Sequence, residues 1–129
     1  MFADTKAFSS FSVNNVKAAK EFYGGLFGLE VRDQPMGFVL QLKSGGQIFV
    51  YPKDNHTPAS FTILNFPVDN IDKAVDELTK KGITFEQYNN SEMPQDDKGI
   101  MRGLSAKLGP DIAWFKDPAG NILAILQES

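Results

Sequence analysis

Few side chains in this sequence could perform chemistry, and they are scattered. His56 is the only histidine and cysteine is absent, so a thiolate zinc site and a cysteine nucleophile are excluded. Ser9 and Ser10 are possible nucleophiles, but no histidine and acid accompany them, so strand packing or hydrogen bonding to a ligand is favoured. His56 lies in the polar link 52–58 and is expected to be a solvated linker residue. These residues form no recognisable catalytic motif.

Acidic residues gather in one polar stretch, residues 86–109. Glu92, Asp96 and Asp97 could offer oxygen ligands to a cation there. They lack an ordered ligand pattern, so a solvated polar loop is the preferred interpretation. The many turn-forming residues of this stretch predict a mobile surface loop that could cover a site.

The sequence signals for strands and a capped helix occur twice along the chain. FSVNNV at 11–16 returns after 55 residues as FPVDNI at 66–71, and GQI at 46–48 returns after 74 residues as GNI at 120–122. Each half is predicted to form a strand, a helix capped by Asn or Asp, and three further strands. The predicted fold class is therefore α+β, a single domain over 1–129 built from two tandem βαβββ modules. Module one covers 1–55, module two covers 59–129, and the polar insertion 86–109 belongs to the second.

Composition narrows the function classes. With 42% hydrophobic and 22% charged residues, the 129-residue chain is typical of a globular domain. A formal net charge of −3 without a basic run argues against a nucleic-acid partner. No apolar stretch is long enough to span a bilayer and the start does not resemble a signal peptide, so a cytoplasmic location without membrane partners is expected.

Two phrases carry a family resemblance. EFYGGLFGLEV at 21–31 and WFKDPAGNIL at 114–123 resemble the vicinal oxygen chelate superfamily of glyoxalases, bleomycin-resistance proteins and extradiol dioxygenases. The resemblance covers nearly the whole chain and implies that two curved mixed sheets form around a cleft, usually completed in a homodimer. Metal-dependent members carry ligands on the first and last strands of each module. Those positions correspond here to Phe8, Val50, Ile63 and Ala124, whose apolar side chains cannot bind a divalent cation. No metal and no cofactor are therefore expected.

The sequence thus favours a metal-free protein that binds or sequesters a small apolar or aromatic molecule, similar to the bleomycin-resistance branch. Its predicted ligand-binding cleft has an apolar lining with a few hydrogen-bonding groups, supplied by Phe8, Ser10, Ser12, Ile48, Val50, Phe61, Ile63, Asn65, Trp114, Ile122 and Ala124.

The alternative is an enzyme of the same fold, a lyase, isomerase or dioxygenase with a noncanonical site. The predicted cleft face contains no His, Asp or Glu to act as a general base, and catalytic residues stay unassigned. Closure of the insertion could carry in Tyr88, Glu86 or Arg102. A module that only binds other proteins has no sequence feature in its favour.

Overall fold

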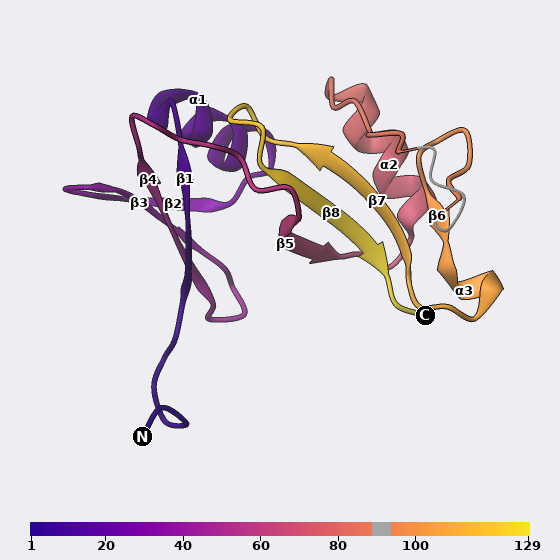
Figure 1. Cartoon of the computed structure of the whole chain (residues 1–129), viewed down its shortest axis with the longest axis horizontal. Coiled ribbons are helices and arrows are strands. Elements are labelled where there is room, and N and C mark those ends of the chain that lie inside the picture. The colour runs from indigo at the N-terminus through magenta and orange to yellow at the C-terminus, as the bar shows by residue number, and fades with distance from the viewer. Residues whose placement is uncertain (89–93) are drawn as a thin grey trace. The chain divides into compact units, whose positions relative to one another are not determined.

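The computed structural model describes residues 1–88 and 94–129. The chain divides into two compact units, Met1–Pro58 and Ala59–Ser129, each with one four-stranded mixed sheet and helices (Figure 1). This confirms the predicted α+β fold with a βαβββ-like arrangement in each half. Each unit is described by itself.

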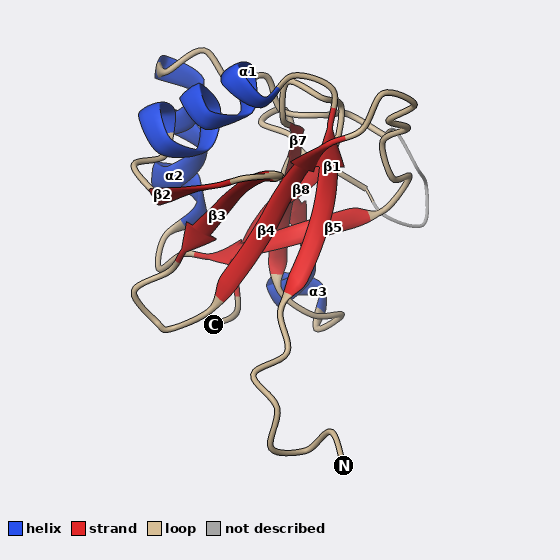
Figure 2. Cartoon of the chain, turned by 90° about the vertical axis from the view of Figure 1, so that its left-hand side faces the viewer, coloured by secondary structure: helices blue, strands red, loops and turns tan. Residues whose placement is uncertain are grey.

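The first unit contains a sheet with the strand order β1-β4-β3-β2, in which β1 runs parallel to β4 and the other neighbours are antiparallel. Figure 2 shows these four strands side by side. The elements follow in chain order as β1 (Ser9–Val13), α1 (Val16–Lys20), η1 (Glu21–Leu26), β2 (Glu30–Gln34), β3 (Gly37–Gln41) and β4 (Gln47–Pro52).

The first helix begins where the sequence predicts. The Asn15 side chain accepts a hydrogen bond from the Ala18 amide at 3.0 Å, which satisfies one of the free donors of the first turn. The helix then widens into the π-helical η1, where the Phe27 amide donates to the Phe22 carbonyl. Tyr23 is fully buried, with its ring centroid 5.8 Å from that of Phe11. The helical segment therefore covers the sheet face that carries Phe11.

The second unit repeats this plan with the strand order β5-β8-β7-β6. Asn70 caps its helix by accepting a hydrogen bond from the Lys73 amide at 3.0 Å. Its elements are β5 (Thr62–Pro67), α2 (Ile71–Lys80), β6 (Met101–Arg102), α3 (Gly103–Ala106), β7 (Asp111–Lys116) and β8 (Ile122–Gln127).

The turn between β7 and β8 is structural, as the sequence indicates. Buried Asp117 accepts hydrogen bonds from the amides of Ala119 and Asn121, both at 2.9 Å. Gly120 has φ of 85°, the left-handed conformation that such a turn favours. Asp117 is therefore engaged in holding the turn.

The described part of the insertion, residues 86–88 and 94–109, is more ordered than a solvated loop. It contributes β6 and α3, and Arg102 donates to Asp72 of α2 at 2.9 and 2.7 Å. Asp96 accepts from the Ile100 amide and from Arg102, at 2.9 and 3.0 Å. The expectation of a solvated polar loop is therefore wrong for this part. Glu92 lies outside the described residues, and a covering role for the insertion stays a prediction.

Within residues 1–88 and 94–129, no helix has the length and apolar character needed to cross a bilayer. This agrees with the short apolar stretches of the sequence.

Candidate functional site

Strand register decides which side chains share a face of the first sheet. Ser10 lies opposite Phe49 and Ser12 opposite Tyr51, while Phe49 also lies opposite Val39 of β3. Residues paired in this way point to the same side of a sheet. The face away from α1 and η1, here called the open face, therefore carries Ser10, Ser12, Glu30, Arg32, Gln34, Val39, Gln41, Gln47, Phe49 and Tyr51.

Ile48 and Val50 do not belong to this face. Ile48 pairs with Ser9 and Val50 with Phe11, so both point toward the helical segment, and Val50 is fully buried. The sequence-based expectation that they share a face with Ser10 and Ser12 is wrong by one residue. Phe49 is the residue opposite Ser10, just as Ala124 is opposite Asn65 in the second unit.

The one-residue error in the predicted face of Ile48 and Val50 arises because the turns before β4 and β8 differ in length. β4 begins directly after Gly46, at Gln47, whereas β8 begins two residues after Gly120. Asn121 is retained in the turn because its amides bond to Asp117. Alignment of the two glycines therefore misplaces β4 by one position, and a one-residue slip moves every side chain to the other face.

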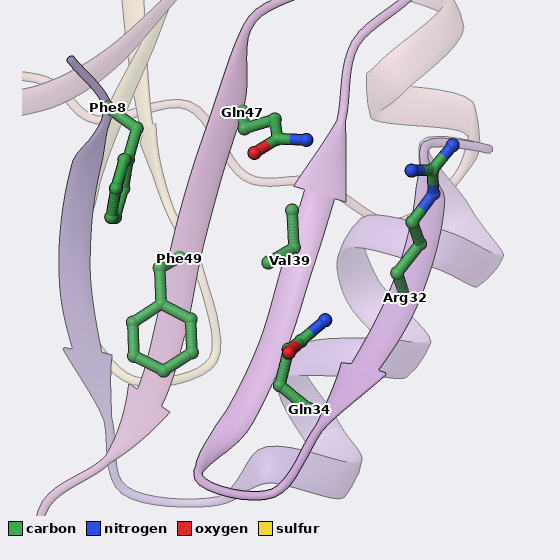
Figure 3. Close-up of a pocket in the computed structure, with 6 residues that line it drawn as sticks. All are labelled: Phe8, Arg32, Gln34, Val39, Gln47 and Phe49. Atoms are coloured by element: carbon green, nitrogen blue, oxygen red, sulfur yellow. The ribbon is translucent and has the colours of Figure 1, made fainter. Parts of the chain in front are cut away.

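A hollow of about 410 Å³ lies on the open face. Figure 3 shows its six lining side chains: apolar Phe8, Val39 and Phe49, with Arg32, Gln34 and Gln47 as polar members. Phe8 remains 65% exposed at one edge. An apolar floor with a few convergent polar groups is the usual composition of a small-molecule site.

Gly37, which pairs with Gln34 on the open face, lies so close to the β4 backbone that no side chain fits there. An added Cβ would lie 2.1 Å from the Val50 carbonyl oxygen, at a backbone φ of 150°. The Phe49 and Tyr51 rings stack in the next strand, with centroids 5.8 Å apart and planes at 17°. This end of the face thus presents flat aromatic surface next to a position without a side chain.

The polar side chains of the open face are bonded to one another. The Arg32 guanidinium pairs with the Glu30 carboxylate, and both side chains are 56% exposed. Gln47 donates to Gln41 at 2.7 Å. The sequence-based statement that this face lacks Asp, Glu and His missed Glu30, because no residue of β2 was assigned to the predicted cleft face.

His56 also differs from its sequence-based interpretation. Its Nδ1 lies 2.6 Å from the Ser12 hydroxyl, and the two side chains are hydrogen-bonded and partly buried. His56 is therefore not a freely solvated linker residue. It lies at the Ser12 end of the open face, and its 44-residue separation from Ser12 in the chain left no local signal for this contact.

In the second unit, Asn65, Ala124 and Trp114 pair across three strands and share one face. The Trp114 indole donates to the Thr62 hydroxyl at 3.1 Å, and Thr62 pairs with Ile122. Trp114 and Ala124 are buried, and only Asn65 of the three is exposed.

The two remaining predicted residues of this unit lie near the start of β5. Ile63 lies at a register shift between Thr62 and Leu64, and Phe61 precedes the strand and is 67% exposed. The described ring contacts include none between Phe61 and Trp114, so stacking of both residues on one ligand stays a prediction.

Closure of the insertion was expected to carry Tyr88, Glu86 or Arg102 into the cleft. In the structure all three side chains contact other residues of the second unit. Tyr88 packs edge-on against Trp114 with centroids 5.7 Å apart, and burial, followed by the charge of Glu86, raises the pKa of its phenol. Glu86 pairs with Lys116 at 3.3 Å. Hydrogen bonds from Arg102 hold the pKa of Asp72 well below its usual range. Arg102 therefore anchors the insertion to α2.

The side chains at the metal positions of the superfamily do not fit a cation. Phe8, Ile63 and Ala124 are apolar, and so is Phe49, which the register puts in place of Val50. In the part of the chain that the structure describes, no three His, Asp or Glu side chains gather as a metal site would require.

Comparison with known proteins agrees with the βαβββ-like fold of each unit. The Glyoxalase/Bleomycin resistance protein/Dioxygenase superfamily profile matches residues 8–125. Among curated proteins, no significant match is found.

Three solved structures share the fold. A superfamily member from Sphaerobacter thermophilus is 23% identical, with coverage of 95% of this chain and 96% of that one and a TM-score of 0.67. An antibiotic binding protein from a Streptomyces species is 21% identical, with both chains fully covered and a TM-score of 0.64. A fosfomycin resistance protein from Listeria monocytogenes is 11% identical, with 100% and 96% coverage and a TM-score of 0.69. The profile match over most of the sequence shows that the chain belongs to the Glyoxalase/Bleomycin resistance protein/Dioxygenase superfamily.

Proposed function

We propose that this protein binds a small apolar or aromatic molecule on the open face of the first sheet, without a metal ion. The observation that carries the proposal is the hollow lined by Phe8, Val39 and Phe49 with polar side chains at its rim. Binding or sequestration of the ligand is then the whole activity.

The energetics suit such a ligand. Covering apolar surface contributes about 25 cal/mol per Å², so roughly 200 Å² removed from water contributes about 5 kcal/mol before the costs of association. The amides of Gln34 and Gln47 can fix the orientation of a polar substituent. A ligand of two or three rings therefore has enough area to bind on this face.

Two further observations support binding over metal-assisted chemistry. The first is the apolar character of Phe8, Phe49, Ile63 and Ala124 at the positions where metal-dependent relatives hold their ions. The second is the likeness in fold to an antibiotic binding protein from a Streptomyces species.

Fluorescence titration with the uncharged dye phenylnaphthylamine tests the proposal. Phe49→Ala should weaken binding roughly tenfold, because the loss of an aromatic contact is worth about 1 to 1.5 kcal/mol. Phe2→Ala removes a phenylalanine that precedes β1 and does not line the hollow, so it should leave the affinity unchanged. Equal affinities of the wild-type protein and Phe49→Ala, with both folded by circular dichroism, would refute binding on this face.

The proposal includes a homodimer, as the superfamily resemblance implies. Light scattering should then give twice the chain mass, and a stable monomer at micromolar concentration would count against it. A lasting dimer should bury more than about 1,000 Å² in total.

A second candidate, an enzyme, is favoured by the contact between Ser12 and His56 at 2.6 Å. A histidine at the end of a binding face can transfer protons, which lyases and isomerases require. A bound carbonyl compound should then incorporate deuterium from heavy water, and His56→Gln should abolish incorporation while binding is retained. Equal incorporation in both proteins would dismiss this candidate.

A further inference from the structure

We infer that the molecule bound on the open face is an aromatic anion, whose carboxylate, sulfonate or phosphate group pairs with Arg32. The inference rests on the proposed function and narrows its ligand class. It follows from the charge and the layout of the side chains in the hollow.

Arg32 is the charged side chain among the six that line the hollow. Its guanidinium is planar, stays protonated and presents several donors that match an oxyanion. Gln34, two residues along the same strand, and Gln47 add amide groups to the rim. The polar rim therefore offers a fixed positive charge to the ligand.

The aromatic side chains lie on the opposite side of the hollow from Arg32. Figure 3 shows Phe8 and Phe49 near β1 and β4, Val39 between, and Arg32 on β2. β4 and β2 are separated by β3 alone, so their backbones are roughly 10 Å apart at the usual strand spacing. A ligand whose rings cover Phe49 while its anion meets Arg32 must span a similar length, about that of two or three fused or linked rings.

Glu30 competes with the anionic group of the ligand for Arg32. It pairs with Arg32 in a solvent-exposed salt bridge, the kind that contributes only about 0 to 1 kcal/mol. Glu30 itself does not line the hollow. An incoming anion can therefore replace Glu30 at small cost, and removal of the Glu30 charge should strengthen binding of anions alone.

A matched pair of dyes tests the inference. Anilinonaphthalene sulfonate carries an anion on nearly the same ring system that phenylnaphthylamine presents without charge. Each dye is titrated by fluorescence into the wild-type protein, Arg32→Gln, Glu30→Gln and Phe49→Ala. Lys17→Gln serves as the charge control, because Lys17 is exposed on α1, away from the open face.

Arg32→Gln should weaken the sulfonate dye about tenfold, since hydrogen bonds to charged groups are worth about 1.5 kcal/mol or more. Glu30→Gln should strengthen it roughly threefold, in line with a weak exposed pair. Neither change should alter the affinity of phenylnaphthylamine. Phe49→Ala should weaken both dyes, and Lys17→Gln should weaken neither.

The dye titrations distinguish a failure of the anion assignment from a failure of the proposed function. If both dyes lose affinity in Phe49→Ala but Arg32→Gln and Glu30→Gln change neither, the anion assignment is overturned and the proposed function stands. If Lys17→Gln lowers the sulfonate affinity as much as Arg32→Gln, general charge attraction accounts for the result and the assignment is likewise overturned. If Phe49→Ala changes neither dye, the proposed function fails and the inference fails with it.

Discussion

Replacement of Arg102 by methionine should destabilise the second unit by about 2 kcal/mol, on the magnitudes of exposed and buried ion pairs. The Arg102 guanidinium donates to Asp72 at 2.9 and 2.7 Å, pairs with Asp96 at 3.0 Å and lies 3.6 Å from Asp111. It thereby joins the insertion, β7 and α2. Methionine keeps much of the side-chain length but removes every donor.

The magnitude follows from how exposed each partner is. The Arg102 and Asp72 side chains are 37% and 48% exposed. Their bidentate pair is therefore discounted for solvent screening to roughly 1 kcal/mol. The Asp111 side chain is only 11% exposed. Leaving that carboxylate without its cation adds about 1 kcal/mol.

The loss should depend on pH with a definite sign. Hydrogen bonds from Arg102 lower the pKa of Asp72 in the folded protein below its unfolded value. Such a carboxylate stabilises the fold fully above the unfolded pKa of about 3.9 and loses that contribution as the pH falls further. The difference in stability between the wild-type protein and Arg102→Met should therefore be constant near neutrality and shrink as the pH falls from about 5 to 3.

Urea unfolding at several pH values, followed by circular dichroism, measures the free energy of unfolding. Arg32→Met is the matched control. It breaks one exposed pair with Glu30 and should cost less than about 0.5 kcal/mol. Equal losses for the two variants, or a difference that grows toward acid pH, would show that Arg102 does not stabilise the second unit through Asp72.

Three further predictions concern register, backbone and metal. Val50→Ala should cost about 2 kcal/mol because its side chain is fully buried, whereas Phe49→Ala should cost clearly less, and urea unfolding of both variants checks the register. Gly37→Ala should destabilise by more than about 2 kcal/mol because its Cβ meets a backbone carbonyl, while Gly25→Ala, with open space around it, should be neutral or slightly stabilising on thermal unfolding. A chelator should change neither the melting temperature nor the affinity for phenylnaphthylamine, and a drop in either would point to a bound ion.

Much of the fold was predictable because its signals are local. Asn15 and Asn70 cap their helices as the sequence indicates, and the side chain of Asp117 holds the turn before β8. The capping and turn chemistry of such residues depends on neighbours within four positions. The repeat then set the order of elements in both halves.

The face assignments were harder to predict because they depend on single-residue register. Ile48 and Val50 were placed on the wrong face since the β3–β4 turn is one residue shorter than the alignment of glycines implied. By contrast, the positions of Asn65 and Ala124 relative to each other follow the predicted register.

Contacts between distant parts of the chain had no sequence signal. The hydrogen bond between Ser12 and His56 and the ion pair between Arg102 and Asp72 join residues 44 and 30 positions apart. Neither residue pair lies in a motif of fixed spacing. Their roles became visible only when the strands and helices were placed.

A crystal structure of the protein with phenylnaphthylamine bound would show whether the open face of the first sheet binds the ligand. We expect the dye to lie in the hollow, with its rings against Phe49 and Val39 and with Phe8 at its edge. Dye bound against Trp114 and Tyr88 instead, or a cation held by protein side chains at the bound dye, would contradict it.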